Sequence, residues 1–211
     1  MTNLRRLLAV DPSLTCTGWA LFAFEGHGKP KEALLAIGTL KSLPPRIGLP
    51  ARLLDLQQKV KMIYQSLRLG ANDVLVCEAP TTMRDPRAAF KVEQVRGIFE
   101  ALAREHGVDI PGRLNPRSVQ FEVMGLRGKQ LERKIVKETA VSIVKTLFAK
   151  ELLNLGFDPE TPNLRRHQDV VDALLLGCLA ASKLREGRWS LADSDLSFAG
   201  KSARGGRRLP R

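Results

Sequence analysis

The sequence has few cysteines and lacks any long hydrophobic run. Its three cysteines, Cys16, Cys77 and Cys178, each lie among apolar residues and show no paired spacing. We therefore expect reduced, buried thiols in a cytoplasmic protein rather than a disulfide framework. The longest apolar stretch, residues 173–181, is well short of the ~20 residues that a membrane-spanning helix needs. The apolar run at residues 7–10 ends at a charged residue, which argues against a signal peptide.

Acidic residues are also scarce relative to basic ones. The 211 residues include 34 Lys and Arg but 22 Asp and Glu, which gives a formal net charge of +12. A cationic surface of this size attracts phosphate backbones or anionic lipid, and Arg, which outnumbers Lys here, suits bidentate phosphate contacts. Because the membrane interpretations fare poorly, nucleic acid is the leading class of partner. The length and the apolar fraction of 44% indicate one domain with a hydrophobic core.

The first part of the chain predicts a meander of three strands, then a helix and a buried strand. Turn residues separate apolar-rich segments at 4–10, 18–24 and 33–40. From Pro50 the apolar spacing becomes that of a helix, which we expect Gly70 to end. The continuous apolar run at residues 73–78 suits a strand buried on both faces. A strand, a crossover helix and a further strand favour a right-handed parallel unit.

The rest of the chain predicts helices with one short strand between them. Asp85 and Asn115, each followed by proline, are typical N-caps. The predicted elements are helices at 85–107, from 115, at 129–154 and at 165–184, and a strand at 109–114. The whole pattern predicts an α/β fold, a mixed five-stranded sheet flanked by helices. We assign residues 1–186 to this domain and residues 187–211 to a basic, flexible tail.

Four acidic residues stand where apolar residues are expected. Asp11 ends the first apolar run, Glu78 ends a later one, and the pair Asp169 and Asp172 interrupts the last predicted helix. Ionised carboxylates in such settings are rarely tolerated unless they are paired or bound to a cation. Each has an ordinary alternative: a turn residue for Asp11, a solvated strand end for Glu78, and acids that stabilise a helix N-terminus for the pair.

Taken together, these carboxylates predict a metal site. If the strands ending at Asp11 and Glu78 are parallel neighbours, both side chains emerge at the same edge of the sheet. The last helix, packed across that edge, would bring Asp169 and Asp172 beside them, because residues three apart share a helix face. Oxygen ligands favour Mg²⁺ or Mn²⁺. Two such ions ~3.5–4 Å apart can promote phosphodiester hydrolysis, and the basic surface would hold the polyanion that an acidic site repels.

Three motifs occur in a characteristic order: residues 11–18 (DPSLTCTG), Glu78 with residues 89–97 (AFKVEQVRG), and residues 169–174 (DVVDAL). In this order and spacing they resemble the motifs of the RuvC family of Holliday junction resolvases. The similarity extends over residues 4–184. The resemblance implies the RNase H-like fold.

The resemblance also implies a function and its residues. The family's metal-binding carboxylates correspond to Asp11, Glu78, Asp169 and Asp172, and a basic residue near the scissile phosphate corresponds to Lys137. It implies a homodimer that uses two Mg²⁺ ions per site, replaceable by Mn²⁺, and that nicks opposed strands of a four-way DNA junction. A branch-migration motor is a further candidate partner.

The sequence departs from the family's pattern at three positions. Ser13 stands where many members have glycine, and Gln120 replaces a lysine often found in the helix after the fifth strand. Thr81 occupies a position where the family often has an aromatic residue that acts as a wedge near the crossover of the junction. Met83 and Phe90 are candidates for this role here. We therefore expect changes in the first turn, in one phosphate contact and in junction opening.

Basic side chains on two predicted helices are candidates for DNA contacts: Arg84, Arg87, Lys91, Lys134 and Lys137. A solvated helix face explains most such runs, but the net charge favours DNA contact here. Engagement of six to ten phosphates would lower the affinity roughly 10³–10⁵-fold between low and moderate salt. His167, two residues before Asp169, has a surface or capping role as its ordinary interpretation and a proton shuttle as its functional one.

Three other functions fit parts of this pattern. The first is an RNase H-like, phage-type nuclease that acts on branched DNA more broadly, and the second is a junction-binding protein whose carboxylates are structural. The third is a sugar-kinase or actin-like ATPase, which also opens with an Asp-containing strand. The chain is short for its two-domain body, and the sequence has no second glycine-rich phosphate loop.

Overall fold

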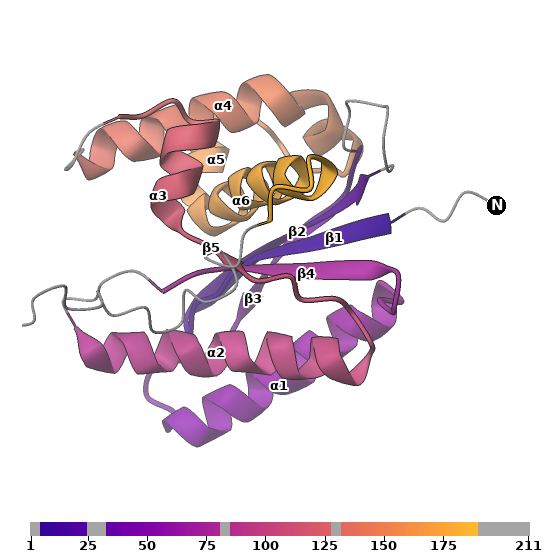
Figure 1. The fold of residues 1–211 in the computed structure, drawn as a ribbon. Coiled ribbons are helices and arrows are strands. Elements are labelled where there is room, and N and C mark those ends of the chain that lie inside the picture. Colours follow the sequence, from indigo (N-terminus) through magenta and orange to yellow (C-terminus); the bar gives the residue numbers. More distant parts are fainter. Residues whose placement is uncertain (1–4, 25–32, 81–84, 128–131, 190–211) are drawn as a thin grey trace, which may run out of the picture.

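A five-stranded mixed sheet lies between two layers of helices (Figure 1) in the computed structural model, which describes residues 5–24, 33–80, 85–127 and 132–189. The strands are β1 Arg5–Asp11, β2 Cys16–Phe24, β3 Ala33–Lys41, β4 Asp73–Glu78 and β5 Arg113–Leu114. Their order across the sheet is β3-β2-β1-β4-β5. β1–β2 and β2–β3 pair antiparallel, whereas β1–β4 and β4–β5 pair parallel. The predicted fold class, the meander and the parallel unit are confirmed.

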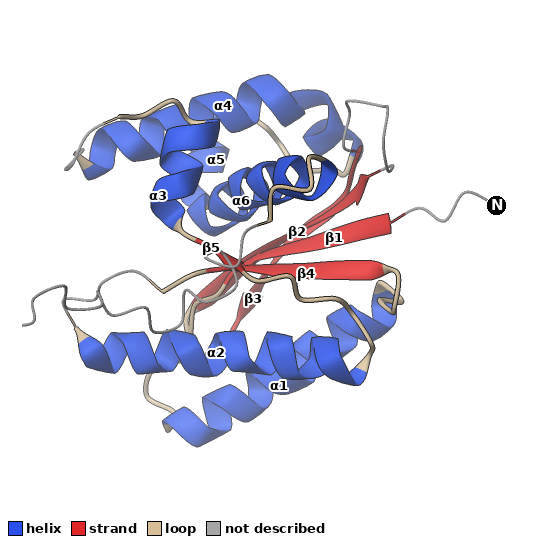
Figure 2. Cartoon of the chain, viewed as in Figure 1, coloured by secondary structure: helices blue, strands red, loops and turns tan. Residues whose placement is uncertain are grey.

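The helices are divided between the two faces of the sheet (Figure 2). On one face lie α1 Leu49–Ser66 and α2 Pro86–Glu105. On the other face lie α3 Pro116–Ser118, the π-helical turn η1 Val119–Val123, α4 Arg133–Asn154, α5 Thr161–Arg166 and α6 Gln168–Arg185. The predicted N-caps are present, since Asp85 and Asn115 accept hydrogen bonds from the backbone N–H groups two residues ahead.

The two central strands are buried on both faces. In β1, Leu7 and Ala9 pack into the core beneath α4 and α6. The alternate residues Leu8 and Val10 pack into the second core, beneath α1 and α2. This double burial explains why the strand sequences are continuous apolar runs rather than alternating patterns.

Two glycines allow α6 to lie directly on β2. A Cβ atom at Gly18 would be 1.9 Å from the backbone oxygen of Asp169, and one at Gly177 would be 2.1 Å from the ring of Phe22. Both separations are too short for any side chain, so only glycine permits this crossing. Because Gly18 pairs with Asp11 across β1 and β2, the crossing places the N-terminus of α6 beside the end of β1.

Three predicted boundaries were wrong. The last predicted helix, 165–184, begins three residues later as α6, at Gln168, and its first two predicted residues, Arg165 and Arg166, instead end α5, with the break at His167. The first helix ends at Ser66, and Arg68, with φ of 50°, takes the left-handed conformation in place of Gly70. The fifth strand shrinks to two residues plus an isolated bridge between Val74 and Asp109.

Other expectations are met in part. The described cysteines are free thiols, but only Cys77 is buried, whereas Cys16 and Cys178 are partly exposed. No helix within the described ranges is long and apolar enough to cross a membrane. The start predicted for the fourth helix, at residue 129, and most of the predicted tail lie outside the described residues. The domain boundary at residue 186 therefore stays a prediction.

Candidate active site

Asp11 and Glu78 lie at neighbouring ends of parallel strands. β1 and β4 pair with Val10 opposite Cys77, so the next residue of each strand is the acid. Both side chains are partly buried. The sequence therefore located the edge of the sheet at which the two carboxylates emerge, as expected for an α/β site.

The turn after Asp11 is closed by a buried threonine. The Thr17 hydroxyl donates to the carbonyl of Ser13 at 2.7 Å and accepts from the Ser13 backbone N–H at 3.0 Å. Thr17 has no exposed surface. Ser13 does not take a positive φ, so the backbone of this turn does not require glycine at position 13.

The other two acids come from the first turns of α6. Asp169 and Asp172 lie where the Gly18 contact holds that helix against the sheet. Gln168 donates its side-chain amide to Asp172 Oδ1 at 2.9 Å, which fixes one carboxylate oxygen. The pair thus approaches the edge of β1 and β4, as predicted.

The four acids interact electrostatically. The pKa of Asp11 is raised well above its ordinary value, chiefly by burial and then by the negative charges of the other three acids. Burial and the charge of Asp172 raise the pKa of Glu78 to about 7. Burial also raises the pKa of Asp172 to about 6, although the Gln168 hydrogen bond and the charges of Lys137 and Arg133 oppose this. The acids therefore form one mutually repelling cluster.

This cluster fits a hard divalent cation in its chemistry. Its donors are carboxylate oxygens, the ligands that Mg²⁺ and Mn²⁺ prefer, and a cation would relieve both the repulsion and the burial of charge. As placed, however, no three or more His, Cys, Asp or Glu side chains in the described part of the chain have the separations of a coordination sphere. The four acids lie at one edge of the sheet, but their carboxylate groups do not converge on a common point.

A buried arginine supports the end of β4. Arg96 of α2 is 1% exposed, and its Nε donates to the backbone oxygen of Glu78 at 2.8 Å. Glu93 pairs with Arg96 and also accepts from Arg113. Arg113 in turn donates to both carboxylate oxygens of Glu100, at 2.7 and 3.0 Å. This network joins α2, β4 and β5 directly behind the acids. The positive charge of Arg96 partly offsets the rise in the pKa of Asp11 and of Glu78.

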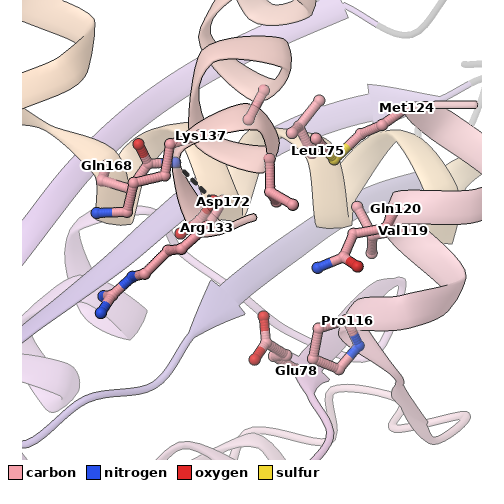
Figure 3. A pocket seen from close by; sticks show the side chains of 12 residues that line it. Glu78, Pro116, Val119, Gln120, Met124, Arg133, Lys137, Gln168, Asp172 and Leu175 are labelled. Atoms are coloured by element: carbon pink, nitrogen blue, oxygen red, sulfur yellow. Dashed lines mark hydrogen bonds between the residues drawn. The ribbon is translucent and has the colours of Figure 1, made fainter. Parts of the chain in front are cut away.

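A pocket of about 280 Å³, which we call the acid cleft, opens beside the cluster. Figure 3 shows Glu78 across this pocket from Asp172, with Arg133 and Lys137 on the Asp172 side. Gln168, also a lining residue, makes the hydrogen bond drawn there. Lys137 thus lines the acid cleft together with Asp172 and is exposed to solvent.

The remaining predicted DNA-binding residues are spread more widely. Lys134 is exposed on α4, next to the acid cleft, in a second pocket. Arg87 and Lys91 are exposed on the first turns of α2 but do not line the cleft. Arg84 lies outside the described residues. His167 packs edge-on against the ring of Phe157, with 5.3 Å between ring centroids, which supports its structural interpretation.

Sequence reasoning missed several residues of the site. Arg133 and Gln168 line the cleft, and Arg96 holds the end of β4. The spacing of Gln168 four residues before Asp172 is a signal for a helical side-chain pair and could have identified it. Gln120, the replacement for a family lysine, also lines the cleft. Of the wedge candidates, Phe90 is 72% exposed, whereas Thr81 and Met83 lie outside the described residues.

Solved structures share this fold. The RuvC structure from Thermus thermophilus aligns with a TM-score of 0.62 at 22% identity, over 86% of this chain and 96% of that one. The T. thermophilus RuvC in complex with a Holliday junction substrate aligns with a TM-score of 0.63 at 21% identity and the same coverage. The fold class of this chain is therefore the RNase H-like α/β fold. In this chain the acids gather at the carboxyl edge of the sheet.

Three curated relatives carry one name, crossover junction endodeoxyribonuclease RuvC. The protein from Parvibaculum lavamentivorans is 29% identical over 118 residues, which are 56% of this chain. The match spans 63% of the length of that relative, less than two thirds. That from Chelativorans sp. is 28% identical over 148 residues, 70% of this chain and 81% of the relative. The protein from Sphingopyxis alaskensis is 26% identical over 122 residues, which are 58% of this chain and 73% of the relative. No family model matches the chain. The relatives and the shared fold confirm the resemblance to the RuvC family of Holliday junction resolvases.

Proposed function

We propose that this protein is an endonuclease that resolves four-way (Holliday) DNA junctions. The observation that carries the proposal is the gathering of four acids from β1, β4 and α6 at one edge of the sheet, beside a cleft lined by Lys137 and Arg133. The names of the curated relatives and the junction complex of the T. thermophilus protein support the same activity.

The acids and Lys137 have separate roles in this proposal. Asp11, Glu78, Asp169 and Asp172 would hold Mg²⁺, with two ions per site and Mn²⁺ as a substitute. When bound, such ions activate water and stabilise the leaving oxygen of a phosphodiester. Lys137 neutralises negative charge on the phosphate at the cleft. The water oxygen bonds to phosphorus, the bond to the 3′ oxygen breaks, and that oxygen takes up a proton, which leaves 5′-phosphate and 3′-hydroxyl ends.

Other side chains position this machinery. Gln168 restrains Asp172 through its amide hydrogen bond, and Arg96 restrains the backbone of Glu78. The DNA backbone is held by the basic residues predicted from the sequence: Arg87, Lys91 and Lys134, which are exposed, and Arg84. Lysine and arginine suit this task because backbone contacts need charge rather than base recognition.

A homodimer would place two such sites on one junction, so that paired nicks fall symmetrically on opposed strands. An apolar groove of about 450 Å³ between α1 and α2 offers a surface for the second copy. Leu53, Leu54 and Ile98 line it, and Leu54 is 56% exposed. A branch-migration motor as partner and a cytoplasmic location stay predictions from the resemblance and the thiols.

The experiment that tests the function is cleavage of a synthetic mobile four-way junction with and without Mg²⁺, mapped at nucleotide resolution. We expect paired cuts that require the metal. Asp11→Asn and Asp172→Asn should bind the junction with nearly unchanged affinity but lower the cleavage rate by at least about 100-fold, since each removes a ligand charge needed for chemistry. Retained cleavage in both variants would refute the assignment of these acids.

Parallel substrates separate the alternatives. Flaps and forks cleaved as fast as junctions would indicate an RNase H-like nuclease of broader range. Salt-sensitive junction binding without any metal-stimulated cleavage would indicate a junction-binding protein with structural carboxylates.

A further inference from the structure

A second pocket, of about 440 Å³, borders the acid cleft between α4 and the junction of α5 with α6. Arg133, Lys137 and Gln168 line both pockets. Lys134, Glu138 and Arg165 line the second pocket alone. We call this second pocket the basic pocket. A DNA strand that passes through the acid cleft therefore meets the basic pocket without leaving the surface of α4.

The charges of the basic pocket are not explained by the stability of α4. Four basic side chains line it against one acidic side chain. Arg133 and Lys137 are four residues apart, a spacing at which like charges destabilise a helix. Arg133 and Lys134 lie in the first turn of α4, where cations oppose the helix dipole. The acidic N-cap residue before them, Glu132, makes no side-chain capping hydrogen bond. An anion in the pocket would reverse both effects.

Arg165 is held at this pocket by the packing of α5. Its neighbour Leu164 is completely buried in the core. Two polar contacts fix the approach to α5: Asn163 donates to the backbone oxygen of Asp158 at 2.6 Å, and Lys145 pairs with Glu160 at 2.8 Å. The guanidinium is thus carried on an anchored turn rather than on a free loop.

The partner of Arg165 is exchangeable. Arg165 and Glu138 approach to 3.6 Å, with side chains 58% and 46% exposed. An exposed pair at this distance contributes little to stability, because water screens its charges. A phosphate offers arginine a bidentate, charge-assisted contact, which is stronger, so a phosphate can replace the carboxylate.

We propose that the basic pocket binds a backbone phosphate of the DNA strand, next to the phosphate in the acid cleft, with Arg165 as its main contact. This subsite rests on the proposed function, since it is the continuation of the strand's path through the cleft. Its ligand is the phosphodiester group of nucleic acid, recognised through charge and without regard to base sequence. Glu138 acts against binding until the strand displaces it from Arg165.

The test measures binding of the full-length protein to a fluorescent four-way junction in EDTA from 50 to 400 mM NaCl. Each phosphate contact contributes about 0.9 to the slope of log affinity against log salt. We expect Arg165→Gln to flatten the slope by about that amount and to weaken binding roughly tenfold at 50 mM salt. Arg165→Lys should keep the slope, and Glu138→Gln should tighten binding.

Arg104→Gln is the matched control. Arg104 is also exposed, at 66%, and also lies 3.6 Å from a glutamate, Glu100, but it is near the end of α2, which runs back to the opposite edge of the sheet. This variant should bind as the wild type does.

The outcomes separate the subsite from the function. A wild type that cuts junctions, together with an unchanged salt slope for Arg165→Gln, would overturn the subsite alone. An equal loss in Arg104→Gln would also overturn it, because the effect would then be one of net charge. A wild type that neither binds nor cuts junctions would overturn the proposed function, and the subsite with it.

Discussion

Glu78 and Asp172 have pKa values raised to about 7 and about 6, mainly by burial. At neutral pH the folded chain thus holds ionised carboxylates that cost more free energy than they would in the unfolded chain. The same residues are the ones that a cation needs. The buried carboxylate charges that would attract a cation therefore also lower the stability of the metal-free protein. This loss of stability should be measurable.

The sign of this cost follows from the direction of the pKa change. The folded pKa of Glu78 lies above its ordinary value of 4.5, so the folded state binds the proton more tightly than the unfolded state. Stability is then greatest below about pH 4.5 as far as this group is concerned, and it falls as pH rises through 7. The difference amounts to about 3 kcal/mol.

We predict that Glu78→Gln raises the unfolding temperature of the metal-free protein at pH 8 by several degrees, and raises it much less at pH 5. Differential scanning calorimetry in EDTA at the two pH values measures this. Glu105→Gln, at the far end of α2, is the control and should change neither value. Destabilisation of equal size at both pH values would contradict the prediction.

At the scale of elements, α2 and β4 are joined by the ion network behind the acids. Arg96 is 1% exposed, yet it supplies the hydrogen bond that holds the Glu78 backbone. Its partner Glu93 is 34% exposed and also accepts from Arg113, so loss of Arg96 acts mainly through the Glu78 backbone oxygen. The network therefore determines how rigidly the end of β4 is held.

We expect Arg96→Met to destabilise the protein by about 1.5–3 kcal/mol, because it removes a charged donor from the Glu78 backbone oxygen. Arg104→Met, a change of the same chemistry at an exposed position of the same helix, should cost less than about 1 kcal/mol. Urea unfolding followed by circular dichroism compares the two. Similar costs for both variants would mean that Arg96 contributes no more than a surface charge does.

At the scale of the whole molecule, the α1–α2 groove and the cleft lie on opposite faces of the sheet. A second copy on the groove would leave both clefts free for DNA. We predict a dimer at micromolar concentration by analytical ultracentrifugation and a monomer for Leu54→Asp, which places a charge in the groove. Leu153→Asp, at a leucine on α4 that is 61% exposed, should remain a dimer. A monomeric wild type would refute the homodimer.

The sequence predicted more of the site's acids than of its basic and amide groups. Asp11 and Glu78 follow buried strands, and the rule that parallel strands end at one edge brought them together. The roles of Arg133 and Arg96 depend on how α4 and α2 pack against that edge, which no local pattern records. The break at His167 was missed for a related reason: Leu164 and Val170 are both buried in the core, so the apolar spacing does not reveal it.

The contact of α6 with Gly18 also has a consequence for synthesis of the chain. Asp11 emerges from the ribosome early, whereas Asp169 and Asp172 belong to the last described helix. A nascent or prematurely ended chain thus carries only Asp11 and Glu78 of the four acids. The site proposed for DNA cleavage is therefore complete only after α6 has been synthesised and has docked on β2.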